Sequence, residues 1–129
     1  MSKVKIFDTY WSIKDCIDQP RALFVFGDNN IKSGKKGQAI IRDCENAIGI
    51  PTKKYPSFKS DAYYTDDEFD KNRKNIRSAI KNIILMANKY ETIYLPENGI
   101  GVGLADLPKR APKTYAYLQK KIDYLKNKL

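Results

Sequence analysis

Six of the seven glycines fall in two short stretches, and each stretch follows an apolar run. The first stretch holds Gly27, Gly34 and Gly37 after residues 22–26, and the second holds Gly99, Gly101 and Gly103 after residues 92–96. Glycine lets backbone N–H groups approach a phosphate closely, and open α/β sheets bind ligands beyond the carboxyl ends of their strands. Two such loops that meet could hold a diphosphate. The alternative is that these glycines only form turns.

Three kinds of side chain near these loops could act on a ligand. Asp28 directly follows the first apolar run and could orient a ribose hydroxyl or a water, or form an Asx turn. Lys35 and Lys36 could neutralise phosphate or, once desolvated, attack the anomeric carbon of a sugar, although loop lysines are commonly just solvated. Glu97 precedes the second loop and could activate a water molecule.

Further polar and aromatic residues could support such a site. Gln38 and Arg42 lie four residues apart, and Arg42 could clamp a phosphate or pair with an acidic neighbour, Asp43 or Glu45. A connector at residues 53–64 interleaves lysines with aromatic rings, which could stack on a base and contact phosphate, or simply pack beneath a long loop: Lys53, Lys54, Tyr55, Phe58, Lys59, Tyr63 and Tyr64.

The chain contains no histidine, which limits the chemistry available to it. Ser-His-Asp, Cys-His and histidine-ligated metal mechanisms are excluded. Cys16 and Cys44 match no metal-ligand spacing, and a buried free thiol is the simpler interpretation of them. Any catalysis must use carboxylates, lysines, tyrosines, amides or water, and we expect neither a metal nor a cofactor.

The net charge of +9, from 24 basic and 15 acidic residues, suits a polyanionic partner such as nucleic acid or a phosphorylated small molecule. From Lys109 onward the chain has seven basic residues and one acidic residue, a face that could contact nucleic acid or merely be solvated. No apolar run reaches the ~18 residues of a membrane helix, and the start lacks the apolar segment of a signal peptide. We therefore expect no membrane contact and a cytoplasmic location, in the host cytoplasm if the gene is viral.

The elements that must position these residues alternate between strands and helices. We predict strands at residues 3–6, 22–26, 47–51 and 92–96, short helices at residues 12–17 and 38–44, and longer helices from residue 65 to about 87 and from 112 to 126. Thr65 and Glu68 have the spacing of a capping box at the start of the third helix. This alternation favours an α/β fold in one domain over residues 1–129, an α/β sandwich with a largely parallel or mixed sheet.

Both glycine stretches resemble segments of the macrodomain family. Residues 92–105 (TIYLPENGIGVGLA) resemble its strand ending in proline, G-x-G-x-G loop and C-terminal helix. Residues 22–30 (ALFVFGDNN) and 34–39 (GKKGQA) are similar to its earlier strand, asparagine and glycine-rich loop, and the resemblance spans residues 22 to about 125. Small phage and bacterial proteins with the pattern F-G-D-N...G-x-x-G-Q-A-x-I-R...G-I-P-T-K are more similar still.

The resemblance implies a three-layer, macrodomain-like fold with a mixed sheet that binds ADP-ribose or a related NAD-derived nucleotide. Asn29 or Asn30 would lie near the distal ribose, and Gly34 and Gly37 would support the loop beside it. The residues of the second loop would bind the diphosphate through backbone amides: Gly99, Ile100, Gly101, Val102 and Gly103. Gly27 and Gln38 complete the expected binding set.

The resemblance also implies that the protein could hydrolyse an ADP-ribosyl linkage, with Asp28, Lys35 or Glu97 as catalytic groups. The chain departs from the macrodomain pattern at Lys35 and Lys36, where typical members have glycine and apolar residues. The aspartate that reads adenine has no clear counterpart, and Asp8 is one candidate for it.

Two other functions remain open. One is a phage-type protein that sequesters a nucleotide signal without catalysis, and the other is a basic nucleic-acid-binding module. For the nucleotide hypothesis, we expect a bulky residue at Gly101 to abolish binding and to leave the fold intact.

Overall fold

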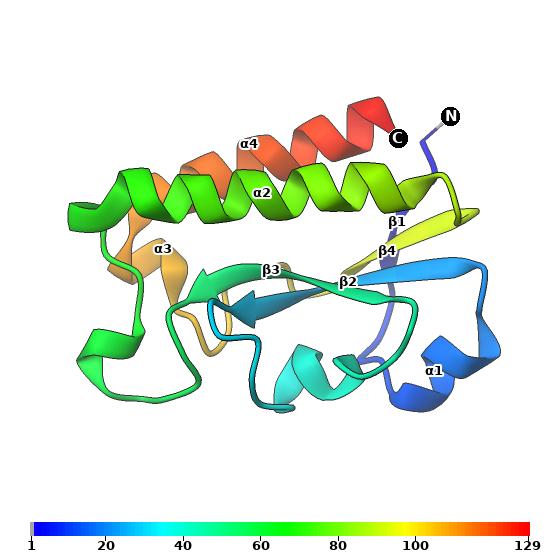
Figure 1. Cartoon of the computed structure of the whole chain (residues 1–129), viewed down its shortest axis with the longest axis horizontal. Helices are drawn as coiled ribbons and strands as arrows, with labels where there is room; N and C mark the ends of the chain where they lie inside the picture. Colours follow the sequence, from blue (N-terminus) through cyan, green and yellow to red (C-terminus); the bar gives the residue numbers. More distant parts are fainter. Residues whose placement is uncertain (1) are drawn as a thin grey trace.

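A four-stranded sheet lies at the centre of the computed structural model, which describes residues 2–129 (Figure 1). The strands are β1 (Val4–Phe7), β2 (Ala22–Asn29), β3 (Ala47–Lys53) and β4 (Thr92–Pro96), in the order β1-β4-β2-β3. All three strand pairs of the described residues are parallel, which confirms the largely parallel alternative and not the mixed sheet that the resemblance implies. The physical reason is that a helical crossover follows each of the first three strands and returns the chain to the same end of the sheet.

The strand β2 is buried on both faces, as its continuous apolar run predicts. Leu23 and Val25 belong to one apolar cluster, and Phe24 and Phe26 belong to a second cluster on the opposite face. The strand continues to Asn29, three residues beyond the predicted end, because residues 27–29 still pair with β3. The two cores therefore lie on the two sides of one strand.

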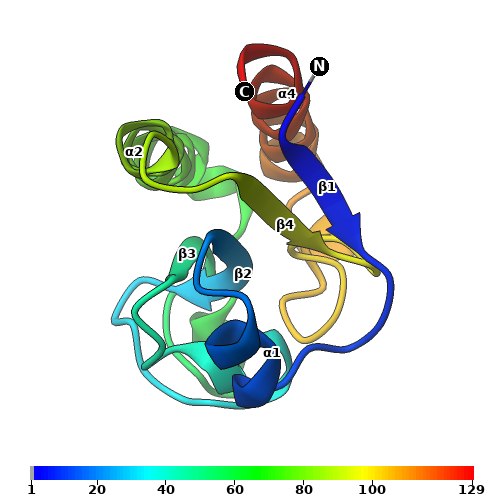
Figure 2. The ribbon, with the colours of Figure 1, turned by 90° about the vertical axis from the view of Figure 1, so that its right-hand side faces the viewer.

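Two long helices, α2 (Phe69–Ala87) and α4 (Pro112–Lys128), lie side by side over one face of the sheet (Figure 2). Their apolar residues recur at helical spacing and fill the larger core, which confirms the predicted helices: Ile76, Ile80, Ile83, Leu118, Ile122 and Leu125.

The start of α2 differs from the prediction. The residues Asp66–Glu68 form a 3-10 helix, η3, and the Thr65 side chain makes no capping hydrogen bond. The Glu68 carboxylate pairs instead with the ammonium groups of Lys54 and Lys71. The predicted capping box is therefore wrong, because the Glu68 side chain forms ion pairs with these lysines and does not cap the helix.

The other face of the sheet carries shorter elements. The helix α1 (Ile13–Asp18) begins at a capping box formed by Ser12 and Asp15. The predicted helix at residues 38–44 is a shorter 3-10 helix, η1 (Gly37–Ile41), and turn residues follow it from Arg42 onward. Further short helices are η2 (Ser60–Ala62) and α3 (Leu107–Arg110).

Both cysteines are free. Cys16 is the buried residue of α1, as expected, whereas Cys44 is only half-buried. Burial raises the pKa of the Cys16 thiol to about 12, and the neighbouring Cys44 thiol adds to the shift. A thiol held in this protonated form is a poor nucleophile.

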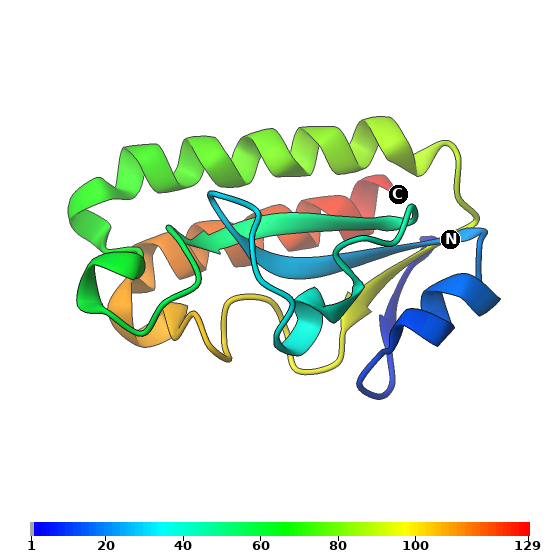
Figure 3. The ribbon, with the colours of Figure 1, turned by 60° about the horizontal axis from the view of Figure 1, so that its bottom comes forward.

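The parallel arrangement decides where the loops go. Since the strands run in one direction, the loops after β2, β3 and β4 leave from the same edge of the sheet (Figure 3). The loop that follows β2 and the loop that follows β4 approach one another at this edge (Figure 3). None of the helices in the described part of the chain combines the length and the apolar character needed to cross a bilayer.

Candidate functional site

A cavity of about 900 Å³ lies at the carboxyl edge of the sheet. Both glycine-bearing loops line it, the first with residues 27–29 and 33–38 and the second with residues 96–98, 101 and 103–105. Thr9, Tyr10 and Trp11 after β1 close another side, and the β3 end with the following connector contributes Lys53 and Phe58. Its volume is that of a site for a small molecule or nucleotide.

Several backbone amides of both loops have no hydrogen-bond partner among the described residues. Within residues 2–129, the N–H groups of Gly34, Lys35 and Lys36 donate to no other protein group, and the same holds for residues 100–105. The positive φ angles of Gly34 and Gly101 give these loops a path that other residues rarely adopt. Successive unpartnered amides along a cavity wall form a binding surface for anions.

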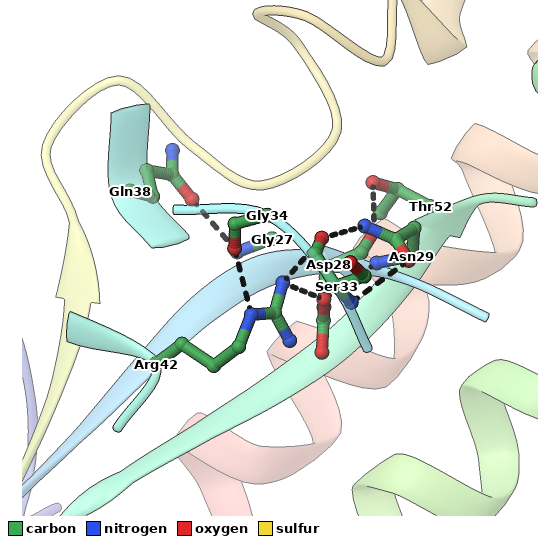
Figure 4. A network of polar contacts seen from close by, with 8 residues as sticks. All are labelled: Gly27, Asp28, Asn29, Ser33, Gly34, Gln38, Arg42 and Thr52. Carbon is green, nitrogen blue, oxygen red and sulfur yellow. Dashed lines mark hydrogen bonds and ion pairs between the residues drawn. The ribbon is translucent and has the colours of Figure 1, made fainter. Parts of the chain in front are cut away.

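Gln38 connects the two loops. Its side-chain oxygen accepts a hydrogen bond from the amide of Gly27 at 2.8 Å (Figure 4), and its side-chain nitrogen donates to the carbonyl of Gly99 at 2.8 Å. A Cβ at Gly27 would lie 3.3 Å from the Gln38 oxygen and 3.8 Å from the amide nitrogen of Gly101. The glycine therefore allows the loops to come together, and Gln38 fixes their separation.

Asp28 and Arg42 form a buried ion pair beside the cavity. The Arg42 guanidinium lies 2.6 Å from the Asp28 carboxylate and also donates to the carbonyls of Ser33 and Gly34 (Figure 4). The side chains are only 6% and 13% exposed for Asp28 and Arg42. Arg42 therefore pairs with Asp28 and not with Asp43 or Glu45. Its contacts hold the first loop in place.

Asn29 and Asn30 point to different surroundings. The Asn29 side chain donates to the carbonyl of Ser33 at 2.8 Å and closes the turn after β2, at the cavity wall. The Asn30 side chain accepts a hydrogen bond from the Tyr64 hydroxyl at 2.5 Å and lies outside the cavity lining. The structure therefore brings Asn29, and not Asn30, to the cavity.

Some of the other predicted site residues line the cavity and others do not. Gly37, Gly101 and Gly103 line the cavity, as does Glu97, which is exposed and forms no ion pair within residues 2–129. Ile100 is buried in the larger core, and Gly99 and Val102 lie in the second loop without lining the cavity. Ile100, Gly99 and Val102 therefore contribute to the second loop through their backbone and not through side chains at the cavity.

The lysines of the first loop are exposed. The ammonium of Lys35 lies 2.5 Å from the carboxylate of Asp43, and both side chains are largely in solvent. Lys36 also lines the cavity and is exposed. Neither lysine is in the desolvated setting that would make it a nucleophile at neutral pH.

Lys53 is much less exposed than these two lysines. Its position as the last residue of β3 comes only from the structure. It is 8% exposed and lines the cavity, and its ammonium donates to the carbonyl of Ser57 at 2.6 Å. The Tyr63 ring lies 4.4 Å from this ammonium and 3.6 Å from the Arg110 guanidinium. Burial, and then the charge of Arg110, lower the pKa of Lys53 below its usual value.

The sequence contains a partial signal for Lys53. The residue lies two positions beyond the predicted strand at residues 47–51, and ligands bind at the edge of the sheet where such strands end. Its burial could not be read from the sequence, because Tyr63 and Arg110 come from distant segments.

The aromatic connector separates into exposed and buried rings. Phe58 is 71% exposed and lines the cavity, so its ring is available to a ligand. Tyr63 and Tyr64 pack inside, and burial raises the pKa of Tyr64 to about 12. Within residues 2–129, the structure groups no three Cys, Asp or Glu side chains that could hold a metal ion.

Comparison with known proteins gives one match. The model of a family of unknown function (DUF7831) matches residues 6–121. No curated protein and no solved structure matches the chain. The matched residues run from β1 into α4 and include both glycine-bearing loops. The chain therefore belongs to the DUF7831 family.

Proposed function

We propose that this protein binds ADP-ribose or a related NAD-derived nucleotide in the cavity at the carboxyl edge of the sheet. The single observation that supports this most strongly is that two glycine-bearing loops line one cavity of about 900 Å³ and contain amide groups without a protein partner among the described residues. A diphosphate suits such amides, because it has several charged oxygens that can each accept a hydrogen bond from a backbone N–H group. The proposal includes a macrodomain-like sandwich of three layers, with α1 and η1 as the layer opposite α2 and α4.

The charged side chains around the cavity carry a small positive excess, which favours the binding of an anion. Lys35, Lys36 and Lys53 line it together with the acidic side chain of Glu97, while Asp28 and Arg42 neutralise one another. Phe58 offers an exposed ring at the cavity for a base or a sugar to pack against. In this proposal the backbone amides hold the phosphates, and Lys35 and Lys36 add long-range attraction.

A second candidate function, hydrolysis of an ADP-ribosyl linkage, is favoured by Lys53. Its amine is buried at the cavity and has a lowered pKa, which increases the share of the neutral, nucleophilic form. The amine would form a bond to the anomeric carbon while the bond from that carbon to the leaving group breaks. The leaving group takes up a proton, and water then releases the sugar and restores the amine. Glu97, which lines the same cavity, would activate that water.

The variant that tests the binding site is Gly103→Val. Gly101 is unsuitable, contrary to our expectation from the sequence: its φ is +86°, and a Cβ there would lie 3.0 Å from Leu107, so a side chain would strain the fold. Gly103 lines the cavity, and a Cβ there meets nothing within 4 Å. A valine at this position therefore fills ligand space without disturbing the core.

We expect Gly103→Val to weaken ADP-ribose binding roughly tenfold or more, a loss of about 1.4 kcal/mol, with an unchanged melting temperature. Calorimetric titration with ADP-ribose, AMP and ribose 5-phosphate measures the effect. Ala116→Val on the exposed side of α4 is the matched control and should bind as the unmodified chain does. Equal affinities of the two variants, or no binding of any of these ligands, would contradict the proposal.

Hydrolysis is tested by the release of ADP-ribose from an ADP-ribosylated protein or oligonucleotide. We expect Lys53→Arg to abolish release while ADP-ribose binding persists, because arginine keeps the charge but is not a nucleophile at neutral pH. Lys59→Arg, at an exposed position of the same connector, should release product at the normal rate. Release by the Lys53→Arg variant would exclude this lysine, and binding without release by the unmodified chain would leave a binding protein.

A further inference from the structure

The positive charge of the chain is concentrated in two helices. Together α2 and α4 contain ten of the 24 basic residues and two of the 15 acidic residues, so they account for a net charge of +8 out of +9. The remaining 93 residues are nearly neutral. The basic residues are Lys71, Arg73, Lys74, Arg77, Lys81, Lys113, Lys120, Lys121, Lys126 and Lys128, and the acidic residues are Asp70 and Asp123.

Most of these charges lie on the exposed sides of the two helices. The helices pack side by side over the sheet (Figures 1 and 2). Their apolar residues are buried in the larger core. At 1.5 Å per residue they are about 28 and 25 Å long. Eight of the ten basic side chains are exposed. Among the described residues, only Lys71 of these eight forms an ion pair.

This distribution of basic residues does not stabilise the two helices. Lys74, Arg77 and Lys81 follow one another at spacings of three and four residues, where like charges repel. Opposite charges that would offset this repulsion are scarce on the same face, since Asp70 and Asp123 are the two acidic residues of both helices. A bound polyanion would remove the repulsion.

We propose that the outer face of α2 and α4 binds duplex nucleic acid through its phosphate backbone. Duplex DNA carries about one negative charge per 1.7 Å of its length, which suits a basic face that extends over about 25 Å. The contacts would be with phosphates and would depend little on base sequence.

Other polyanions fit this face less well. A membrane-surface helix inserts an apolar side into the lipid, but the apolar sides of α2 and α4 are buried, with only Leu85 and Tyr124 as large exposed apolar residues on them. Single-stranded nucleic acid is held by stacking on exposed aromatic rings, and Tyr124 is the one such exposed ring on these helices within the described residues.

This surface is separate from the proposed nucleotide site. No residue of α2 or α4 lines the cavity in the described part of the chain. The inference therefore goes beyond the proposed function, and either one can fail while the other holds.

The test compares two variants that each lose four positive charges. The first replaces exposed, unpaired residues of the helix face by glutamine, which keeps a high helix propensity: Lys74→Gln, Arg77→Gln, Lys81→Gln and Lys120→Gln. The control replaces exposed lysines elsewhere: Lys5→Gln, Lys14→Gln, Lys32→Gln and Lys59→Gln. Fluorescence anisotropy with labelled DNA and RNA duplexes is measured from 50 to 200 mM NaCl, and circular dichroism checks that both variants fold.

We expect the unmodified chain and the control to bind a duplex with an affinity that falls steeply with salt. In the helix-face variant, the slope of log K against log salt should become shallower by about 0.9 for each lost phosphate contact, while ADP-ribose binding stays unchanged. An equal loss in both variants would show a diffuse effect of net charge and overturn the proposal. So would failure to bind any duplex at 50 mM NaCl, or binding only to vesicles rich in phosphatidylserine.

Discussion

At the scale of single residues, several predicted ligand-binding side chains prove to organise the loops. Gln38 spans the two glycine-bearing loops, and the Asn29 side chain closes the turn after β2. Asp28 and Arg42 together hold the first loop against the sheet. Among the described residues, the groups at the cavity without a protein partner include backbone amides and the carboxylate of Glu97, whereas the ammonium of Lys53 donates to Ser57.

Removing one partner of the Asp28 and Arg42 pair should be costly. In Arg42→Gln, the Asp28 carboxylate stays buried and loses its positive partner, so the free energy of unfolding should fall by about 3 kcal/mol. Urea denaturation at pH 7 measures this loss. In the double variant Asp28→Asn with Arg42→Gln, the loss should be smaller, because no unpaired charge remains.

The matched control is Lys14→Gln, which removes an ion pair with Asp18 at the surface. The side chains of Lys14 and Asp18 are 81% and 53% exposed, so the free energy of unfolding should change by less than about 0.5 kcal/mol. An Arg42→Gln protein as stable as this control would show that the buried pair does not hold the loop.

At the scale of elements, α4 is capped by a residue that lies far away in the sequence. The Asp66 carboxylate accepts hydrogen bonds from the amides of Lys113 and Thr114 in the first turn of α4, and from the Thr114 hydroxyl. Burial by itself would raise the pKa of Asp66, but these hydrogen bonds hold the pKa below its usual value. The contact joins the starts of the two long helices.

The Asp66 contact makes a pH-dependent contribution to stability. Because the folded pKa is lower than the usual value of 3.8, the contribution is complete above that value and is lost as the pH falls through the folded pKa. Asp66→Ala should therefore lower the free energy of unfolding by about 1 kcal/mol at pH 7. The difference from the unmodified chain should shrink below about pH 4.

Urea denaturation at pH 7 and at pH 3 checks this prediction. The neighbouring Asp67→Ala is the control, because Asp67 is exposed and makes none of these contacts. If the two variants lose the same stability at pH 7, Asp66 does not cap α4.

At the scale of the whole molecule, charge and cavity lie in different places. The net charge of the chain suggests an anionic ligand without saying where it binds. The structure places nearly all of that charge on the helix layer, whereas the cavity offers mainly amides and a few lysines. Binding in the cavity should therefore depend weakly on salt and binding on the helix face strongly, which makes ionic strength the variable that separates the two proposals.

The sequence by itself determined the parts that depend on local patterns. The apolar run at residues 22–26 predicted a strand buried on both faces, and helical spacing predicted α2 and α4, because periodicity reflects which sides of an element are buried. The glycine positions also identified the two loops that line one cavity.

Only the tertiary structure decided the features that join distant residues. Gln38 and Gly99 are 61 positions apart, Asp66 and Thr114 are 48 apart, and the burial of Lys53 depends on Tyr63 and Arg110. The parallel sheet is decided in the same way, by crossovers that bring separate strands together. Such contacts produce no periodic pattern in the sequence. Each one depends on which distant segment the fold brings next to a residue, and not on the neighbours of that residue in the sequence.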